Sequence, residues 1–267
     1  MPTVFANGIE IAYRLDGEGS ETILLINGIA DEKESWSMQA GALIEAGYRV
    51  LTFDNRGVGE TAKPVGAYTT RQMAADAKAV VDGLGIDKVH LLGFSMGGMI
   101  AQEYALAYRD TLHSLVLYAT YAEPGPYCLR LFETWETLAR YCGVESAVRD
   151  VLLWCFTPAF YEDQKDLAKE FDDSVQALNL TSESFLGQLA AIQQHDTTDR
   201  LGDISSPTLV LAGAEDFLIP PMQSYRIYER MARAGWLTVP GGHAACWEFP
   251  ADFNAAVLDF VHSNQSV

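Results

Sequence analysis

A serine set between glycines is the part of this sequence best suited to chemistry. The segment GFSMG, residues 93–97, follows a short apolar run and precedes a helical pattern, and it fits G-x-S-x-G. In that motif the serine occupies a sharp, strained turn from strand to helix, and the flanking glycines let neighbouring elements approach. The pattern predicts that Ser95 is lifted clear of a sheet, at a helix N-terminus whose free N–H groups favour negative charge.

A serine hydroxyl becomes a good nucleophile when a base takes its proton, and near neutral pH that base is a histidine. His243 is the candidate, because it follows the last predicted strand in VPGGHAACWEFP. Catalytic side chains of an open α/β sheet gather on loops at the carboxyl ends of its strands. The remaining histidines lie within or at the start of predicted strands, at the end of a predicted helix and near the C-terminus: His90, His113, His195 and His262.

A third group must hold the imidazole in one tautomer and stabilise its charged form. Asp216, in the segment LVLAGAEDFLIP, is the predicted acid, and the adjacent Glu215 is a weaker candidate. Glu123, just after the run SLVLYA, is a further alternative. The chain order serine, aspartate, histidine is the order that one class of serine hydrolases uses.

The remaining requirement is a pair of donors for a developing oxyanion. The backbone N–H of Met96 is the first predicted donor, and the N–H of Ile29 in the loop LINGIADEKESW is the second. Four residues are expected to contact substrate: Asn27, Gly28, Trp36 and Trp135. For Trp36, a role in filling the core is an open alternative.

The elements that position these residues alternate between strand and helix. Residues 9–15 alternate apolar and polar, as an antiparallel strand does, whereas residues 22–27, 48–54, 88–94 and 114–119 are mostly continuous apolar runs typical of buried parallel strands. Helical patterns at 36–46, 70–84 and 96–108 separate them, which predicts an α/β fold with a mostly parallel central sheet flanked by helices.

The alternation stops between residues 122 and 203, where only amphipathic helical stretches occur, and strand patterns resume at 207–213 and 236–242. We therefore expect a core of residues 1–121 and 204–267 interrupted by an α-helical cap of residues 122–203. Leu129, Phe132, Trp135 and Leu138 are expected to share one face of a cap helix.

Composition limits the partners. The chain has 267 residues and a formal net charge of -18, so nucleic acid and anionic membranes are disfavoured. The first twenty residues lack a basic start and a long apolar run, no stretch is long enough to span a membrane, and the four cysteines form no CxxC pair. These features predict a cytoplasmic protein that acts on a small molecule with no metal and no cofactor, and a homodimer is left open.

Taken together, the motifs resemble those of α/β-hydrolases with a helical cap. The oxyanion loop, the segment FDNRGVGET, the GFSMGG turn, GAEDFLIP and GGHAACWEFP occur in that family's order. The resemblance favours the esterase and enol-lactonase branch, whose lactonases carry Asn where Asn27 stands. Two positions depart from the usual pattern: Asn27-Gly28 replaces His-Gly, and Thr61 replaces a serine.

The resemblance and the predicted Ser-His-Asp set together imply a serine hydrolase that cleaves a carboxylic ester or lactone through an acyl-enzyme. A hydrolase of C–C bonds in diketone-like substrates would use the same residues. A ligand-binding receptor with a slow triad is the alternative from another class, since fold alone does not choose among the family's activities.

Overall fold

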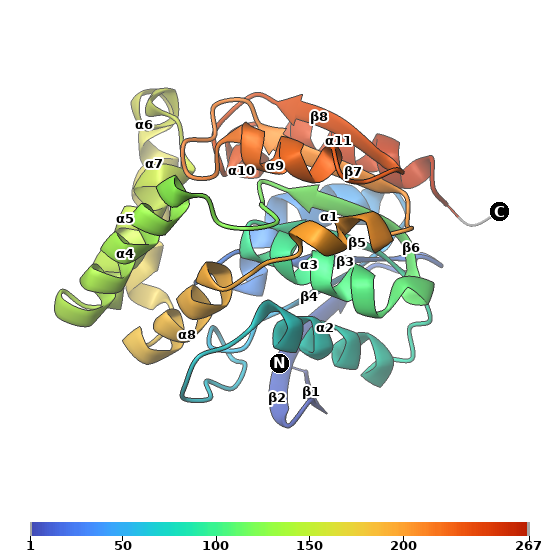
Figure 1. Ribbon diagram of the computed structural model, residues 1–267, viewed down its shortest axis with the longest axis horizontal. Coiled ribbons are helices and arrows are strands. Elements are labelled where there is room, and N and C mark those ends of the chain that lie inside the picture. Colours follow the sequence, from blue (N-terminus) through green and yellow to red (C-terminus); the bar gives the residue numbers. More distant parts are fainter. Residues whose placement is uncertain (1, 266–267) are drawn as a thin grey trace.

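The computed structural model describes residues 2–265 and shows an eight-stranded sheet in the order β1-β2-β4-β3-β5-β6-β7-β8 (Figure 1). All neighbouring strands from β4 to β8 run parallel, and β2 pairs antiparallel with both β1 and β4. The strands are β1 (Thr3–Ala6), β2 (Ile9–Asp16), β3 (Thr22–Ile26), β4 (Arg49–Phe53), β5 (Val89–Phe94), β6 (Leu112–Tyr118), β7 (Thr208–Gly213) and β8 (Ala234–Val239). This confirms the predicted mostly parallel α/β fold.

The central strands are buried on both faces because helices cover both sides of the sheet. Every residue of β3, β5 and β7 is buried, as their continuous apolar sequences predict. Helices α2 (Thr70–Gly83) and α3 (Met96–Ala107) pack against each other in front of the sheet, and α1 (Ser37–Glu45) lies behind it (Figure 1). The C-terminal helix α11 (Pro250–His262) packs against α1.

A run of helices lies between β6 and β7, at the end of the sheet where β5 finishes (Figure 1). It comprises α4 (Pro126–Tyr141), α5 (Val144–Cys155), α6 (Pro158–Asp163), α7 (Lys165–Ser174) and α8 (Ser182–Gln193). The predicted boundaries of this cap at residues 122 and 203 remain a prediction.

The four residues that were expected to share one face of α4 are not all buried. Phe132 and Trp135 are buried, but Leu129 is 37% exposed, and Cys128, Leu131 and Ala139 complete the buried face instead. The physical reason is the helical period: Cys128 lies four residues before Phe132 and therefore on the same stripe, whereas Leu129 is rotated away by one residue.

Three short elements were not anticipated. Strand β1 forms a hairpin with β2 around Asn7-Gly8, both with positive φ, which is the common turn chemistry of a tight hairpin. Helices α9 (Pro221–Tyr228) and α10 (Ala245–Glu248) follow the segments that carry Asp216 and His243. Within residues 2–265, no helix combines the length and apolar character needed to cross a bilayer.

Candidate active site

Ser95 occupies a strained turn at the carboxyl end of β5. Its φ of 55° and ψ of -117° place a non-glycine residue in a conformation that typically costs on the order of 1–3 kcal/mol. The turn requires glycine around it: a Cβ on Gly93 would lie 2.2 Å from the Gly97 carbonyl oxygen, and one on Gly97 would lie 2.1 Å from the Ile26 carbonyl oxygen. The surrounding structure therefore holds the hydroxyl where β5 meets α3.

His243 and Asp216 form a buried hydrogen-bonded pair. Nδ1–H of His243 donates to Oδ2 of Asp216 at 2.8 Å, which leaves Nε2 of the ring free to accept a proton. The other carboxylate oxygen, Oδ1, accepts from the backbone N–H groups of Leu218 and Ile219 at 2.9 and 2.8 Å. These bonds fix the carboxylate, and through it the tautomer of the ring.

The alternative acids lie elsewhere. Glu215 and Glu123 are both exposed, whereas Asp216 is 3% exposed and hydrogen-bonded to His243.

Two of the other histidines contact residues outside the candidate site. His90 is buried against Ser114, and His195 lies 2.9 Å from Thr70. Among the predicted pairs, only Asp216 and His243 are joined by a hydrogen bond within residues 2–265.

The loop after β3 brings Ile29 to the same region. Gly28 lies close to the nucleophile turn, because a Cβ placed on it would be 3.4 Å from Cβ of Ser95. The N–H of Ala30 is already committed to Oε1 of Gln188 on α8, at 2.8 Å. Met96 is the first residue of α3, so its N–H has no partner four residues back within the helix. The oxyanion role of the Ile29 and Met96 N–H groups stays a prediction, with which these positions are compatible.

Two expected substrate contacts are wrong in position. Asn27 and Trp36 are 0% and 2% exposed and lie behind the cavity wall. Asn27 holds the loop instead: its Nδ2 donates to the Asp31 side chain and to the Glu32 carbonyl, and its Oδ1 accepts from Nε1 of Trp36 at 2.9 Å. An amide has both donors and an acceptor, so it can tie several parts of one loop together. Gly28 and Trp135 line the cavity, and their contact with substrate stays a prediction.

The segment FDNRGVGET braces this loop from below. Asp54 accepts from the backbone N–H and the Nζ of Lys33, each at 2.9 Å, and Arg56 forms a buried ion pair with Asp76. Thr61, the departure from the usual serine, accepts from the N–H of Ala12 at 2.9 Å. A hydroxyl is all that this bond needs, so the substitution is accommodated.

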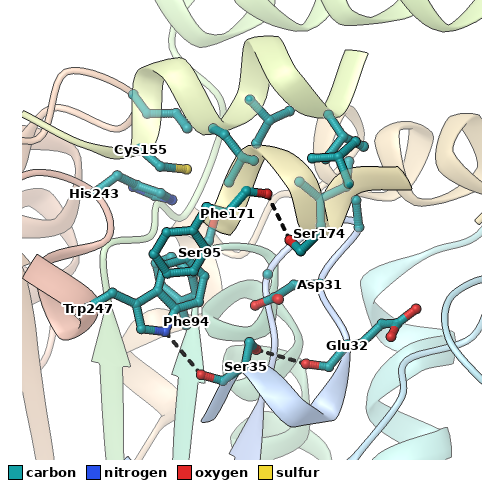
Figure 2. Close-up of a pocket in the computed structure, with 18 of the residues that line it drawn as sticks. Asp31, Glu32, Ser35, Phe94, Ser95, Cys155, Phe171, Ser174, His243 and Trp247 are labelled. Carbon is teal, nitrogen blue, oxygen red and sulfur yellow. Dashed lines mark hydrogen bonds between the residues drawn. The ribbon is translucent and has the colours of Figure 1, made fainter. Parts of the chain in front are cut away.

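A cavity of about 430 Å³ lies above Ser95 and beneath the cap (Figure 2). Its walls are mainly apolar, and a small number of polar groups face it, as in many small-molecule sites. Ser95 and His243 lie on the core side of the cavity, Cys155 and Phe171 come from cap helices, and Asp31 comes from the loop after β3 (Figure 2).

Several cavity residues escaped prediction. Phe171 and Cys155 carry no motif, and only the position of their helices brings them to the cavity. Trp247 belongs to the segment GGHAACWEFP, but nothing in that segment indicated that its ring would line the cavity. Asp31 had a signal, because it begins an acidic run inside the predicted oxyanion loop. Among residues 2–265, no group of three or more histidine, cysteine or carboxylate side chains is arranged to hold a metal ion.

A mostly parallel sheet with a strained serine turn and a hydrogen-bonded His–Asp pair at its carboxyl edge defines a hydrolase of the α/β type. The comparison with protein families agrees: the chain matches the alpha/beta hydrolase fold family over residues 21–250 and belongs to it.

Individual relatives match nearly the whole length of the chain. A protein of Variovorax paradoxus that carries the name "Putative carbamate hydrolase RutD" is 30% identical over 93% of this chain and 95% of its own length. The enol-lactonase of Burkholderia xenovorans superposes with a TM-score of 0.91 at 28% identity, covering 98% of this chain and 100% of its own. A hydrolase of Pseudomonas aeruginosa reaches 0.89 at 31% identity, with 97% of each chain covered. The comparisons thus point to a hydrolase of the esterase and lactonase branch.

Proposed function

We propose that this protein is a serine hydrolase that cleaves a carboxylic ester or lactone with Ser95, His243 and Asp216. The observation that carries the proposal is the His243–Asp216 hydrogen bond of 2.8 Å, on a ring that lines the same cavity as Ser95. A histidine held in this tautomer presents Nε2 to a serine hydroxyl, which is the arrangement that general-base activation needs.

The reaction follows from these roles. Oγ of Ser95 bonds to the substrate carbonyl carbon while its proton passes to Nε2 of His243. The carbonyl oxygen, now negative, accepts from the N–H groups of Met96 and Ile29. The C–O bond to the leaving alcohol breaks and the alcohol departs with the proton from His243. Water then splits the acyl-enzyme with the same histidine as base, which releases the acid and restores Ser95.

The cavity favours a substrate without a carboxylate. None of the cavity-lining residues in the described part of the chain is a lysine or arginine. Three arginines on the cap helices pair with surface carboxylates: Arg130 with Glu133, Arg140 with Glu136 and Arg149 with Asp172. An enol-lactone acid would therefore meet no cationic partner, so the proposal is limited to uncharged or positively charged substrates.

A carbamate is the second candidate substrate, because several relatives carry the carbamate hydrolase name. The same residues would attack a carbamate carbonyl, so the two candidates differ in substrate and share a mechanism.

The compartment and partners are inferred from the same features. All four cysteines are free thiols, and three of them are buried, which supports a reducing cytoplasm. A small-molecule substrate fits the cavity volume, and a homodimer stays open.

A turnover screen tests the proposal. Matched p-nitrophenyl esters, a lactone, an aryl carbamate and a vinylogous diketone acid would be assayed with the wild type and with Ser95→Ala. Ser146→Ala, which changes a half-buried serine of α5 outside the cavity lining, is the control. Ester or lactone turnover that Ser95→Ala abolishes and Ser146→Ala retains supports the proposal. Turnover of the diketone alone, or activity that survives in Ser95→Ala, would contradict it.

A further inference from the structure

The loop that carries Ile29 also brings a carboxyl group to the cavity. Asp31 is partly buried and lines the cavity, and its side chain extends from the loop toward the region of Ser95 and Phe94 (Figure 2). One of its oxygens, Oδ2, accepts from Nδ2 of Asn27 at 3.0 Å. Burial raises the pKa of Asp31 to about 7, against the hydrogen bonds of Asn27 and Ser35, which lower it. The group is thus an acid that lacks a compensating positive charge.

The nearest cation in the sequence does not supply that charge. Nζ of Lys33 lies 2.9 Å from Oδ2 of Asp54 and 3.1 Å from Oε1 of Glu34, and its side chain is 1% exposed. Buried charges in proteins are normally paired. An Asp31 carboxylate would therefore gain most from a positive charge that enters with the substrate.

The rest of the cavity also suits a cation. Three further carboxylates line it, Glu32, Glu34 and Glu170. Five aromatic rings line it as well, and aromatic faces attract ammonium groups: Phe94, Phe132, Trp135, Phe171 and Trp247. The net charge of -18 would draw a cationic substrate toward the protein and slow the approach of an anionic one.

We propose that Asp31 is a specificity-determining residue that binds the positively charged ammonium group of an ester or lactone substrate in the Ser95 cavity. The inference rests on the proposed hydrolase function and names the substrate class for it. The ionised carboxyl pairs with the ammonium group, and the aromatic walls cover the alkyl groups around the nitrogen. A substrate carboxylate at the same place is repelled.

Three p-nitrophenyl esters of matched shape test this inference. Their acyl tails end in a trimethylammonium group, in a neutral tert-butyl group and in a carboxylate. The quaternary nitrogen keeps its charge at every pH. At pH 8 the wild type should show a kcat/KM roughly tenfold higher for the ammonium ester than for the neutral ester, as one ion pair near a protein surface would give, and the carboxylate ester should be the poorest.

The ratio of the ammonium to the neutral kcat/KM should change with pH. It should rise between pH 6 and pH 8, as Asp31 ionises, and stay flat at a clearly lower value in Asp31→Asn. Asp87→Asn, which removes one exposed carboxylate far along the chain, is the matched control and should keep the wild-type ratio and its rise.

Other titratable groups face Asp31 and need to be separated from it. They are Glu32 on its own loop, Asp54 after β4, Glu170 on α7, His243 after β8, Cys155 on α5 and Cys246 on α10. His243 is still present in Asp31→Asn, so any contribution that it makes to the ratio is present there too. Burial raises the pKa of the Cys155 and Cys246 thiols well above its usual range, so both stay neutral. The carboxylates other than Asp31 remain in Asp31→Asn, which therefore isolates the one group.

The outcomes distinguish this inference from the proposed function. Ser95-dependent turnover of the neutral ester without a preference for the ammonium ester, or a preference that Asp31→Asn leaves intact, overturns the inference and leaves the hydrolase. Absence of turnover of all three esters overturns the proposed function. If Asp31→Asn fails to fold by circular dichroism, the wild type decides alone: a ratio above one that rises from pH 6 to pH 8 supports the role of Asp31, and a flat ratio contradicts it.

Discussion

The floor and the roof of the cavity are built in different ways. On the floor, Ser95, Asp216 and His243 are 7%, 3% and 1% exposed, and hydrogen bonds within the core hold each of them. On the roof, α7 contains no buried residue, and Phe171 reaches the cavity through ring contacts with Phe156 and Trp247 at 5.1 and 5.2 Å. Polar bonds and tight glycine contacts fix the floor, whereas apolar packing shapes the roof.

This contrast assigns two tasks to two regions. Hydrogen bonds fix direction, so a floor built from them keeps reacting groups aligned for catalysis. Apolar contacts are non-directional, so a roof built from them tolerates substitution and sets which substrate fits. Changes to the floor should therefore abolish turnover, and changes to the roof should redirect it.

The largest effect is expected at the two groups that move the proton. Ser95→Ala and His243→Ala should each lower kcat by about a million-fold, by analogy with triads in which one member was removed. The fold should persist, because the turn and the loop keep their backbone contacts. Steady-state kinetics and near-UV circular dichroism measure the two properties. A Ser95→Ala enzyme with even a tenth of wild-type activity would contradict the assignment.

The next effect is expected at the acid. Asp216→Asn should lower kcat by roughly ten-thousand-fold, because an amide lets His243 take the wrong tautomer. Glu215→Gln and Glu123→Gln, which change exposed side chains, serve as controls and should keep activity within a few-fold. If one of these controls lost activity while Asp216→Asn kept it, the acid would be misassigned and the rest of the floor would stand.

The free energy of unfolding should depend on pH through His195, which lies at the junction between floor and roof. Burial lowers the pKa of His195 from 6.5 to about 4, beside Thr70 of α2 at 2.9 Å. Between those pH values the unfolded chain binds a proton that the folded protein does not, so the free energy of unfolding should fall as pH drops from 6.5 to 4. The total loss is about 3 kcal/mol and levels off below pH 4.

Urea unfolding at several pH values measures this loss. His195→Gln should show a flatter pH dependence in that window, whatever its stability at pH 7.5. His262→Gln, which removes an exposed imidazole, is the control and should keep the wild-type slope. An equally steep slope in His195→Gln would show that another group is responsible.

The smallest effect is expected on the roof. Phe171→Ala removes a ring from the cavity wall, so kcat/KM for an ester with a bulky acyl group should rise about tenfold relative to a small acetate ester, since pocket contacts of this size discriminate by about 10–200-fold. Leu153→Ala on α5, where the side chain is 58% exposed, is the matched control and should leave the ratio alone. A large fall in kcat for both esters would mean that residues of the roof also help to align the catalytic residues of the floor.

The floor could be predicted from the sequence more fully than the roof. A Cβ added to Gly93, Gly97 or Gly98 would lie within 2.6 Å of a backbone or side-chain atom, so the turn needs glycine at these positions. The geometry of the turn therefore requires the sequence motif that identified Ser95. No such demand acts on Phe171, because many apolar residues would fill the same place. Asn27 shows that prediction from the sequence was also limited on the floor. Its place in the oxyanion-loop motif was clear. Its hydrogen bonds to Asp31 and Trp36 turn it away from the cavity, and these bonds depend on the folded loop.

Covalent labelling is the most direct test of the floor. A fluorophosphonate reacts with a serine that a neighbouring base has activated, and mass spectrometry of the digested protein locates the adduct. One adduct per chain on the peptide that contains Ser95 is expected, abolished in Ser95→Ala and strongly slowed in His243→Ala. An unlabelled wild type, or an adduct on another serine that persists in Ser95→Ala, would contradict the role of Ser95 as the nucleophile.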